Sequence, residues 1–266
     1  MDHISYSQYS SYVKCPRAWY LTKIREAEAK QTWYIPIGSA VHTAVEKYLN
    51  AEPFDLTDIF YGLVADQMLI EPDTSKWLAG GPTDNPIVED KALDRANECY
   101  YNALTFLEDI EVYEIEYDAS GTLPGLDIPI KAYVDILGEH KKHGPVIIDW
   151  KTGSSKPKDN FQLETYEALV CQRAEFLKFD VPKVGLWGML APGASKARPV
   201  DLSHVSPKDV GAKYQAVYEK MQAKLYQTNA GYNCRFCFNQ ENCLLEAGPT
   251  DRAKYYDRAE RDGYPF

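Results

Sequence analysis

The chain has 266 residues, 45% of them hydrophobic, which is long and apolar enough to bury a packed core. Its formal net charge of −10 argues against a protein that coats nucleic acid non-specifically. The charge leaves room for an enzyme that acts on nucleic acid, because a metal site needs carboxylates and a basic groove can lie on an acidic body.

The N-terminal residues 1–10 lack the basic region and following apolar run of a secretory signal. No run of about 18 or more apolar residues occurs further along, so we expect no transmembrane helix and a cytoplasmic protein without a membrane partner. Residues 5–24 read as a helix that Pro16 interrupts. Ser5 and Ser7 are its candidate caps.

Three further helices are predicted from apolar residues at helical spacing, over residues 37–50, 55–70 and 88–110. The Pro- and Gly-rich stretch 72–86 is expected to be a loop.

The pattern then changes to that of strands. Apolar residues alternate from Ile128 to Ile136, which predicts one half-buried strand, and the polar run 138–144 is expected to turn the chain. The other predicted elements are strands at 112–117, 145–150 and 183–190, a helix from the Asp159 cap to about Lys178, and a long helix from Ser206-Pro207 that carries apolar residues as far as Leu225.

This order of elements predicts one α/β domain over residues 1–266, with strands and a helical crossover at its centre. Its expected parts are a helical N-terminal part (1–110), a sheet core that holds the catalytic residues (111–200), and a C-terminal helix with a cysteine cluster region (201–266).

The sharpest local feature is Asp149-Trp150-Lys151, at the end of the apolar strand 145–150. Asp135 lies on the preceding strand, and a short hairpin would bring the two carboxylates side by side. Paired carboxylates repel one another unless a cation lies between them, and hard oxygen ligands suit Mg²⁺ or Mn²⁺. Lys151 shares a face with Asp149 and would activate the attacking water, and the Trp150 carbonyl is a further candidate ligand.

Two helical pairs fit the same site. His42 follows Gly38 by four positions, a spacing that would leave room beside the glycine for the histidine. Gln162 and Tyr166 are also four apart and project together from the helix after Lys151. Taken alone, His42 is more often a satisfied, partly buried histidine, and the second pair is ordinary helix surface.

The chain has six cysteines, and clustered cysteines in a reducing compartment indicate a metal. Cys234-x-x-Cys237-x-x-x-x-x-Cys243 brings three thiolates within reach of one site. On spacing alone the fourth ligand is missing nearby, and zinc is as well supported as iron. Cys99 and Cys171 are each alone in a helical pattern and are expected to be buried structural thiols.

In these motifs the sequence resembles the RecB-like branch of the PD-(D/E)xK nucleases, which includes the nuclease domains of RecB and AddB and the CRISPR-associated RecB-like exonucleases. Ala132 stands where that family has the glycine of Gly-x-x-Asp, which is a mild departure. The family also has an acidic residue on the first strand, a place that Glu114 or Glu116 fits. The other matching residues are Gly38, His42, Asp135, Asp149, Lys151, Thr152, Gly153, Gln162 and Tyr166.

The iron–sulfur members of this branch take their first cysteine from a Cys-Pro-Arg motif near the N-terminus, matched here by Cys15-Pro16-Arg17. The resemblance therefore implies a [4Fe–4S] cluster on Cys15, Cys234, Cys237 and Cys243. Such a cluster would close a loop of more than two hundred residues, which favours a structural role over a redox role.

The resemblance implies a restriction-endonuclease-like core, that is, a central mixed sheet flanked by helices, with a helical cap held by the cluster. It also implies a Mg²⁺- or Mn²⁺-dependent exodeoxyribonuclease that attacks single-stranded DNA ends, in DNA recombination, repair or CRISPR adaptation, with proteins of those processes as partners. Asp135, Asp149, His42 and the Trp150 carbonyl would bind the metal, and Gln162 and Tyr166 would position the strand.

Two other interpretations stay open. One is a non-catalytic DNA-binding or adaptor protein that keeps the fold and the metal cluster. The other is a zinc protein whose acidic surface binds another protein. An RNA substrate fits the chemistry as well, because the proposed reaction does not involve the 2′-hydroxyl.

Overall fold

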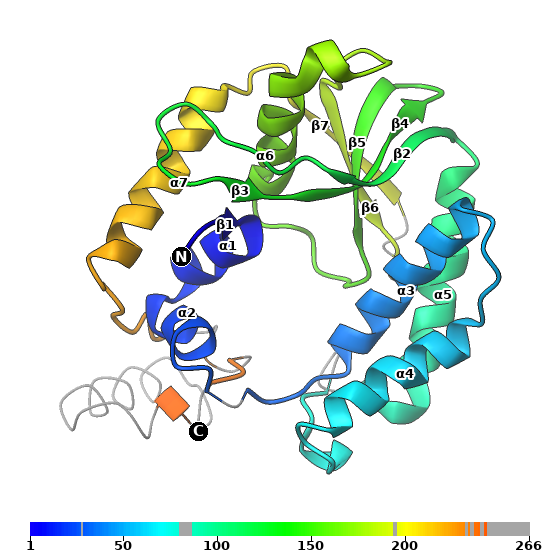
Figure 1. Cartoon of the computed structure of the whole chain (residues 1–266). Coiled ribbons are helices and arrows are strands. Elements are labelled where there is room, and N and C mark those ends of the chain that lie inside the picture. The colour runs from blue at the N-terminus through cyan, green and yellow to red at the C-terminus, as the bar shows by residue number, and fades with distance from the viewer. Residues whose placement is uncertain are drawn as a thin grey trace.

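The protein, described here by a computed structural model, has a central sheet between two groups of helices (Figure 1). The structure describes residues 1–27, 29–79, 87–193, 196–231, 234, 237–239, 242 and 243. In the described ranges no helix is both long enough and apolar enough to cross a membrane.

The first two helices are α1 (Tyr6–Lys14) and α2 (Pro16–Lys23). The chain breaks between them because Pro16 has no N–H to continue α1 but fits the first position of a new helix. The Ser5 hydroxyl accepts a hydrogen bond from the Gln8 amide and caps α1. The interrupted helix predicted over 5–24 is therefore confirmed.

Helices α3 (Tyr34–Leu49), α4 (Leu56–Met68) and α5 (Glu89–Leu107) confirm the next three predictions. The helix predicted to reach residue 110 ends earlier, because the chain enters the first long strand at Ile110. The stretch 72–86 contains one short 3-10 turn, η1 (Thr74–Lys76), and its residues 80–86 lie outside the described ranges.

Five strands form the central sheet in the order β2-β4-β5-β6-β7. Neighbouring strands are antiparallel except β5 and β6, which are parallel and joined by helix α6 (Phe161–Val170) and the 3-10 segment η2 (Cys171–Phe176). The mixed sheet flanked by helices is confirmed. Its strands are β2 (Ile110–Asp118), β4 (Tyr133–His140), β5 (Gly144–Lys151), β6 (Val184–Met189) and β7 (Lys196–Asp201).

The single half-buried strand predicted over 128–136 is wrong. The chain forms β3 (Ile130–Lys131), which pairs in parallel with β1 (Ile4–Ser5) in a second, two-stranded sheet, and then β4. The break falls at Ala132, whose amide hydrogen-bonds to the Ser120 hydroxyl instead of a strand partner. Strand β4 is buried on both faces, and it extends to His140, which shortens the turn expected at 138–144.

The helix predicted over 159–178 keeps its α-helical form only as far as Val170. The predicted long C-terminal helix is α7 (Pro207–Gln222), and the Ser206 hydroxyl caps it by accepting from the Asp209 amide. Leu225, expected on its apolar face, lies beyond its end.

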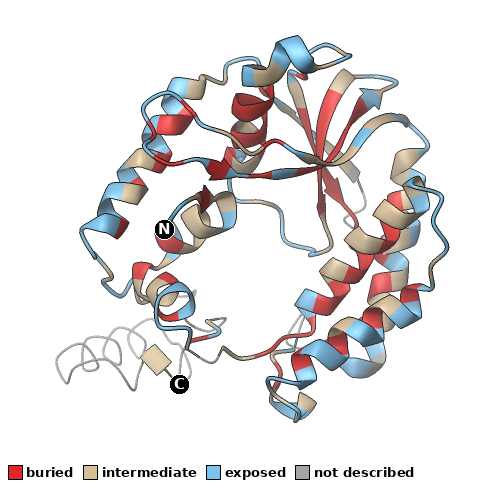
Figure 2. Cartoon of the chain, viewed as in Figure 1, coloured by how far each residue is buried: buried red, intermediate tan, exposed pale blue. Residues whose placement is uncertain are grey.

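Two groups of buried apolar side chains cover the two faces of the sheet (Figure 2). One joins Ile147 of β5 to Leu163 of α6 and Tyr214 of α7. The other joins Ile148, the next residue of β5, to Val41 of α3 and Phe60 of α4. Successive residues of β5 therefore face different helical layers, as a nearly continuous apolar strand in a covered sheet requires.

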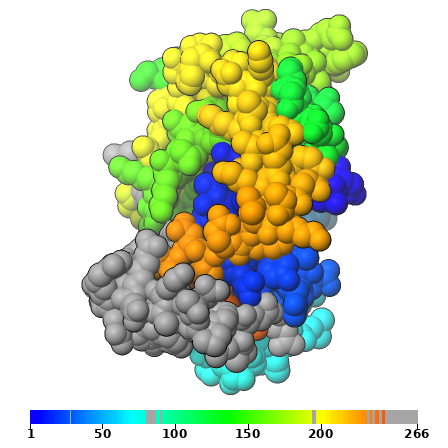
Figure 3. All heavy atoms as spheres, turned by 90° about the vertical axis from the view of Figure 1, so that its left-hand side faces the viewer, coloured from blue at the N-terminus to red at the C-terminus, as the bar shows by residue number. Residues whose placement is uncertain are grey.

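The segment after α7 returns to the N-terminal helices, and Figure 3 shows these parts of the chain, orange and blue, next to one another. The Tyr12 hydroxyl donates to the Leu225 carbonyl at 2.5 Å, and the Asn229 side-chain amide donates to the Lys14 carbonyl at 3.0 Å. These contacts bring the two ends of the described chain together.

Candidate functional site

A row of carboxylates crosses three neighbouring strands of the sheet. The register Ile115–Ile136 and Tyr117–Val134 places Glu116 of β2 opposite Asp135 of β4. The register shift between Val112 and Glu114 decides this pairing, because an unshifted strand would place Ile115 opposite Asp135.

On the other side of β4, Asp135 lies near Asp149 of β5. The paired part of the hairpin ends at Ile136 and Ile148, and Asp135 and Asp149 are the next residues of the two strands; burial and, after it, the Asp135 charge contribute to raising the pKa of Asp149. The side-by-side carboxylates predicted from the sequence are present.

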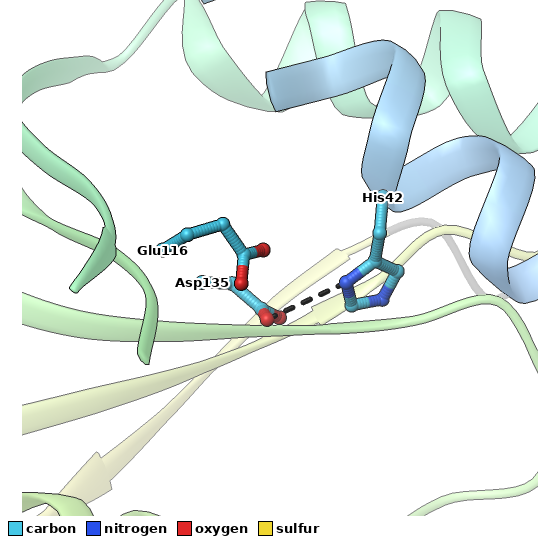
Figure 4. A group of neighbouring side chains, drawn as sticks. All are labelled: His42, Glu116 and Asp135. Carbon is cyan, nitrogen blue, oxygen red and sulfur yellow. Dashed lines mark ion pairs between the residues drawn. The ribbon is translucent and has the colours of Figure 1, made fainter. Parts of the chain in front are cut away.

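Three of the acidic and histidine side chains form a compact group (Figure 4). One ligand atom each from His42 of α3, Glu116 of β2 and Asp135 of β4 lies within 4.8 Å of the other two. The His42 Nδ1 atom is 3.4 Å from an Asp135 carboxylate oxygen. A nitrogen and two carboxylates from three elements are a donor set that fits a divalent metal ion.

Burial and mutual proximity shift the pKa values of two residues of this group. Burial, together with the neighbouring Asp135 carboxylate, raises the pKa of Glu116 to about 7. Burial disfavours the charged form of His42, but Asp135 outweighs this effect and raises the pKa of His42 to about 9. Glu116 also has a φ of 47°, in the left-handed region that costs a non-glycine residue about 1–3 kcal/mol. Both the repulsion and the strain are features that a bound cation would offset.

The Asp135 carboxylate is oriented by the backbone of the next strand. Its Oδ2 atom accepts a hydrogen bond of 2.6 Å from the Trp150 amide. The Trp150 ring packs edge-on against Phe106 at 5.0 Å between ring centres. Trp150 thus has a defined role through its N–H, and the role of its carbonyl as a metal ligand stays a prediction.

Asp149 belongs to a second group that centres on Lys151. The Lys151 ammonium lies 2.5 Å from Asp149 Oδ2, so these two residues share a face as the strand alternation predicts. Gln162 of α6 accepts from Lys151 at 3.0 Å and donates to Asp149 Oδ1 at 2.6 Å. Tyr166, one turn later, lies 2.9 Å from the Gln162 amide and donates to Asp149 Oδ1 at 3.3 Å. Gln162 and Tyr166 therefore project together, as their spacing predicts.

Asp149 is almost fully buried, and burial raises the pKa of its carboxyl while the Lys151 charge lowers it. Three partners fix the position of this carboxylate, and it in turn fixes the Lys151 ammonium. The site therefore has two halves. The metal-binding half is the group of His42, Glu116 and Asp135, and the lysine half is the group of Asp149, Lys151, Gln162 and Tyr166. Asp135 on β4 and Asp149 on the neighbouring strand β5 belong to different halves.

Gly38 lies on α3 next to Thr152, which follows the end of β5. A Cβ atom at this position would meet the Thr152 hydroxyl at 3.4 Å. This is an ordinary contact, so α3 lies close to the end of β5 at Gly38, and the Cβ of an alanine would fit there.

The choice between Glu114 and Glu116 was open in the sequence, and the structure places Glu116 in the site and leaves Glu114 exposed. The two residues share the same type and the same strand, so no local signal distinguishes them. The deciding feature is the bulge in β2, which residue type does not reveal.

The structure brings four cysteines from both ends of the chain near one another. The pKa of Cys237 is raised to about 11, first by burial and then by Cys15, Cys234 and Cys243. Backbone amides point at two of the sulfurs, from Asn229 to Cys15 and from Gly231 to Cys234, both at 3.4 Å. In the described part of the chain, the four thiols do not form a group as tight as that of His42, Glu116 and Asp135.

The two remaining cysteines are apart from this group. Cys99 is fully buried, as expected. Cys171 is only half-buried, so that expectation was wrong, because α6 has ended at Val170 and the thiol lies on the 3-10 segment that follows.

Comparisons with known proteins show what the chain is similar to. A sequence profile of the PD-(D/E)XK nuclease superfamily matches residues 3–243. The Gene 69 protein of Mycobacterium phage L5 is 22% identical over 282 residues, covering 90% of this chain and 95% of that protein. A solved structure titled "Crystal structure of SSO0001" matches with 12% identity and a TM-score of 0.42 over 93% of this chain and 89% of that chain.

Proposed function

Because the chain belongs to the PD-(D/E)XK nuclease superfamily, we propose that it is a Mg²⁺- or Mn²⁺-dependent exodeoxyribonuclease that degrades DNA from single-stranded ends. Membership in the superfamily implies a metal-dependent hydrolase that acts on the phosphodiester bonds of nucleic acid. The observation that carries the proposal is the group of His42, Glu116 and Asp135 beside the ion pair of Asp149 and Lys151.

His42, Glu116 and Asp135 would hold the divalent ion, with Asp149 and the Trp150 carbonyl as further ligands. The crowding of Glu116 against Asp135 supports this assignment, because two carboxylates and a histidine fit a hard cation. When bound, the ion stabilises negative charge on the phosphate and lowers the pKa of the attacking water.

Lys151 would activate the attacking water by orienting it. The ammonium is already held from two sides, by the Asp149 carboxylate and by the Gln162 side-chain oxygen. Gln162 and Tyr166 would position the DNA strand and keep Asp149 in place at the same time. Such pre-oriented groups accelerate a reaction because no reorganisation is needed as charge develops.

We also propose that Cys15, Cys234, Cys237 and Cys243 bind a [4Fe–4S] cluster. Four neighbouring thiols and amide hydrogen bonds to two of the sulfurs support a metal at this position. The choice of an iron–sulfur cluster over zinc rests on the Cys15-Pro16-Arg17 motif that the iron–sulfur members of the RecB-like branch share.

The same proposal places the chain in the RecB-like branch, as a single domain over residues 1–266 and a cytoplasmic protein. DNA recombination, repair or CRISPR adaptation would be its process, with proteins of that process as partners. The similarity to a phage protein over 90% of this chain is compatible with a phage recombination nuclease.

The test is degradation of end-labelled single-stranded DNA by anaerobically purified protein with Mg²⁺ or Mn²⁺. We expect Lys151→Ala to lower the cleavage rate by about 10²- to 10⁴-fold, the usual contribution of a residue that assists proton transfer. Chelation of the divalent ion should abolish cleavage by the wild type, and the product ladder gives the polarity. Equal inactivity of wild type and variant, with the iron content intact, would leave the non-catalytic adaptor as the better interpretation.

A further inference from the structure

A cavity of about 770 Å³ extends from the lysine half of the site to the cysteines. Lys151 and Gln162 line one end, and Cys15 and Cys234 line the other. Helix α1 forms the wall between them. The cavity therefore runs from the lysine half of the site to the cysteine group, two regions whose residues are far apart in the sequence.

One face of α1 lines this cavity with small polar side chains. Ser7, Ser10, Ser11 and Lys14 follow one another at spacings of three, one and three residues, which places them on one side of a helix. Tyr6 stands at the start of the same helix, near the catalytic end, where the Asp149 charge contributes to raising the pKa of its hydroxyl after burial and Asp159. Nine helical residues span about 14 Å.

The charge of the cavity differs from that of the whole chain. Asp and Glu make up 39 of the 266 residues, yet none is among the described residues that line it. Lys14 and Lys151 are the lining residues with a charge, and exposed Lys14 makes no ion pair with any described residue. On an acidic protein, a wall without carboxylates is a path that a polyanion can follow, and the charges of Asp149 and Asp159 are felt at its catalytic end, beside Tyr6.

Aromatic rings reach the cavity from three segments of the chain. Tyr6 comes from α1, Tyr34 from the first turn of α3, and Phe238 from the segment between the cysteines. Tyr34 and Phe238 are 46% and 43% exposed, respectively, so their faces are accessible to a partner. Aromatic faces beside a positively charged path are the combination that binds single strands without sequence preference.

We propose that this cavity is the track of a single DNA strand, with Lys14 as a phosphate contact, the three α1 serines as hydrogen-bond donors to the backbone, and Tyr6, Tyr34 and Phe238 as stacking surfaces. The inference rests on the proposed nuclease function and assigns the residues that hold its substrate. Tyr6 and Lys14 are positioning residues, since the strand they hold leads to Lys151.

The size of the cavity fits a short piece of one strand. Phosphates of one strand of B-form DNA recur about every 3.4 Å along the helix axis, so 14 Å of helix α1 faces about four of them, or fewer in an extended strand. A volume of 770 Å³ lies within the range of about 300–1,000 Å³ in which proteins bury small ligands, which excludes a turn of duplex.

The test measures binding of a fluorescent single-stranded DNA of about 12 nucleotides to the full chain without divalent ions, a length within known single-strand site sizes. Lys14→Gln should lower the slope of log affinity against log salt by about 0.7, the value for one lost phosphate contact on a single strand. Lys208→Gln is the matched control, because Lys208 is exposed on α7 and does not line the cavity.

Tyr6→Leu should weaken binding by roughly 5- to 100-fold, the range of one lost base-stacking contact, and Tyr6→Phe should restore it. With Mg²⁺ present, Lys14→Gln should raise KM for cleavage more than it lowers kcat. The rescue by phenylalanine and the split between KM and kcat separate positioning from a general loss of structure. If Tyr6→Leu fails to fold, the exposed Lys14 still decides the question.

Variants that bind and cleave like the wild type would overturn the track and leave the proposed nuclease intact. A wild type that cleaves DNA but prefers duplex or RNA of the same sequence would overturn the assignment to single-stranded DNA. A wild type that neither binds nor cleaves would overturn the proposed function and the track together.

Discussion

The carboxylate site on the sheet and the cysteine group at the other end of the cavity are assembled in different ways. Glu116, Asp135 and Asp149 come from three neighbouring strands, and one bulge and one hairpin set their positions. Cys15 and Cys234 are more than two hundred residues apart, and they meet because the segment after α7 packs on the N-terminal helices. The first geometry is local, and the second depends on the closure of the whole chain.

This difference has an energetic consequence. The carboxylate group concentrates repulsion and backbone strain, so it costs stability in the metal-free protein. The cysteine group would add stability once a metal links the two ends of the chain. Changes in the first region should therefore affect activity and spare the fold, while changes in the second should affect the fold first.

The largest effect is expected from Cys15→Ser. Loss of the proposed cluster would reopen a loop of more than two hundred residues, which the chain-entropy relation values at about 5 kcal/mol. Urea unfolding under anaerobic conditions measures the free energy of unfolding, and iron analysis follows the cluster. Cys171→Ser is the matched control and should change stability by less than about 1 kcal/mol, because this thiol lies outside the group. A Cys15→Ser protein with wild-type stability would refute the structural role.

The next largest effect is expected from Glu116→Gln, compared with Glu114→Gln. The first removes a proposed metal ligand. Loss of a group that only orients a metal ligand weakens binding or activity by roughly 10- to 100-fold, so loss of the ligand itself should weaken Mn²⁺ binding and cleavage by at least as much. The second changes an exposed residue of the same strand and should leave both unchanged. Calorimetric titration with Mn²⁺ and the cleavage rate are the measurements.

The same pair of variants tests the energetic contrast. Without metal, Glu116→Gln should raise the free energy of unfolding, because the neutral amide does not repel Asp135. A metal-free variant less stable than the wild type would show that Glu116 serves the fold and not the cation.

Much of the site is readable from the sequence because its geometry is local. Alternation along a strand places Asp149 and Lys151 on one face, and helical spacing places Gln162 beside Tyr166, as the contacts at 2.5 and 2.9 Å confirm. The bulge that selects Glu116 is a tertiary feature of a strand pair and has no local signature.

Parts of the fold were missed for comparable reasons. Strand β7 contains Pro199 and lacks alternation, which argues against a strand except at the edge of a sheet, where β7 lies. Strand β1 has two residues, too few for any periodicity. The break at Ala132 follows from the hydrogen bond of its amide to the Ser120 hydroxyl. The two residues are 12 positions apart, so no local sequence pattern reveals this contact.

A smaller effect is expected in the lysine half of the carboxylate site. Gln162→Leu removes the hydrogen bonds to both Lys151 and Asp149 and should slow cleavage by about 10- to 100-fold. Tyr166→Phe removes the hydrogen bonds of its hydroxyl to Gln162 and Asp149 but keeps the direct bonds between Gln162, Lys151 and Asp149, and should slow it by about 2- to 10-fold. Single-turnover rates at saturating metal compare them. If Tyr166→Phe had the larger effect, the contact of the Tyr166 hydroxyl with the DNA strand would matter more than its hydrogen bond to Asp149.

The smallest effect is expected from Gly38→Ala, which tests how α3 carries His42 to the sheet. The added Cβ would meet the Thr152 hydroxyl at 3.4 Å, an ordinary contact, while alanine gains up to about 1 kcal/mol of helix propensity. Stability and Mn²⁺ affinity should therefore change little. Gly38→Leu carries further atoms into the same space, so it should displace α3 from the end of β5 and weaken Mn²⁺ binding through His42 without touching either carboxylate. If alanine were as harmful as leucine, the approach of α3 to Thr152 would be the tightest constraint on the metal-binding half, and this region too would depend on packing between distant parts of the chain.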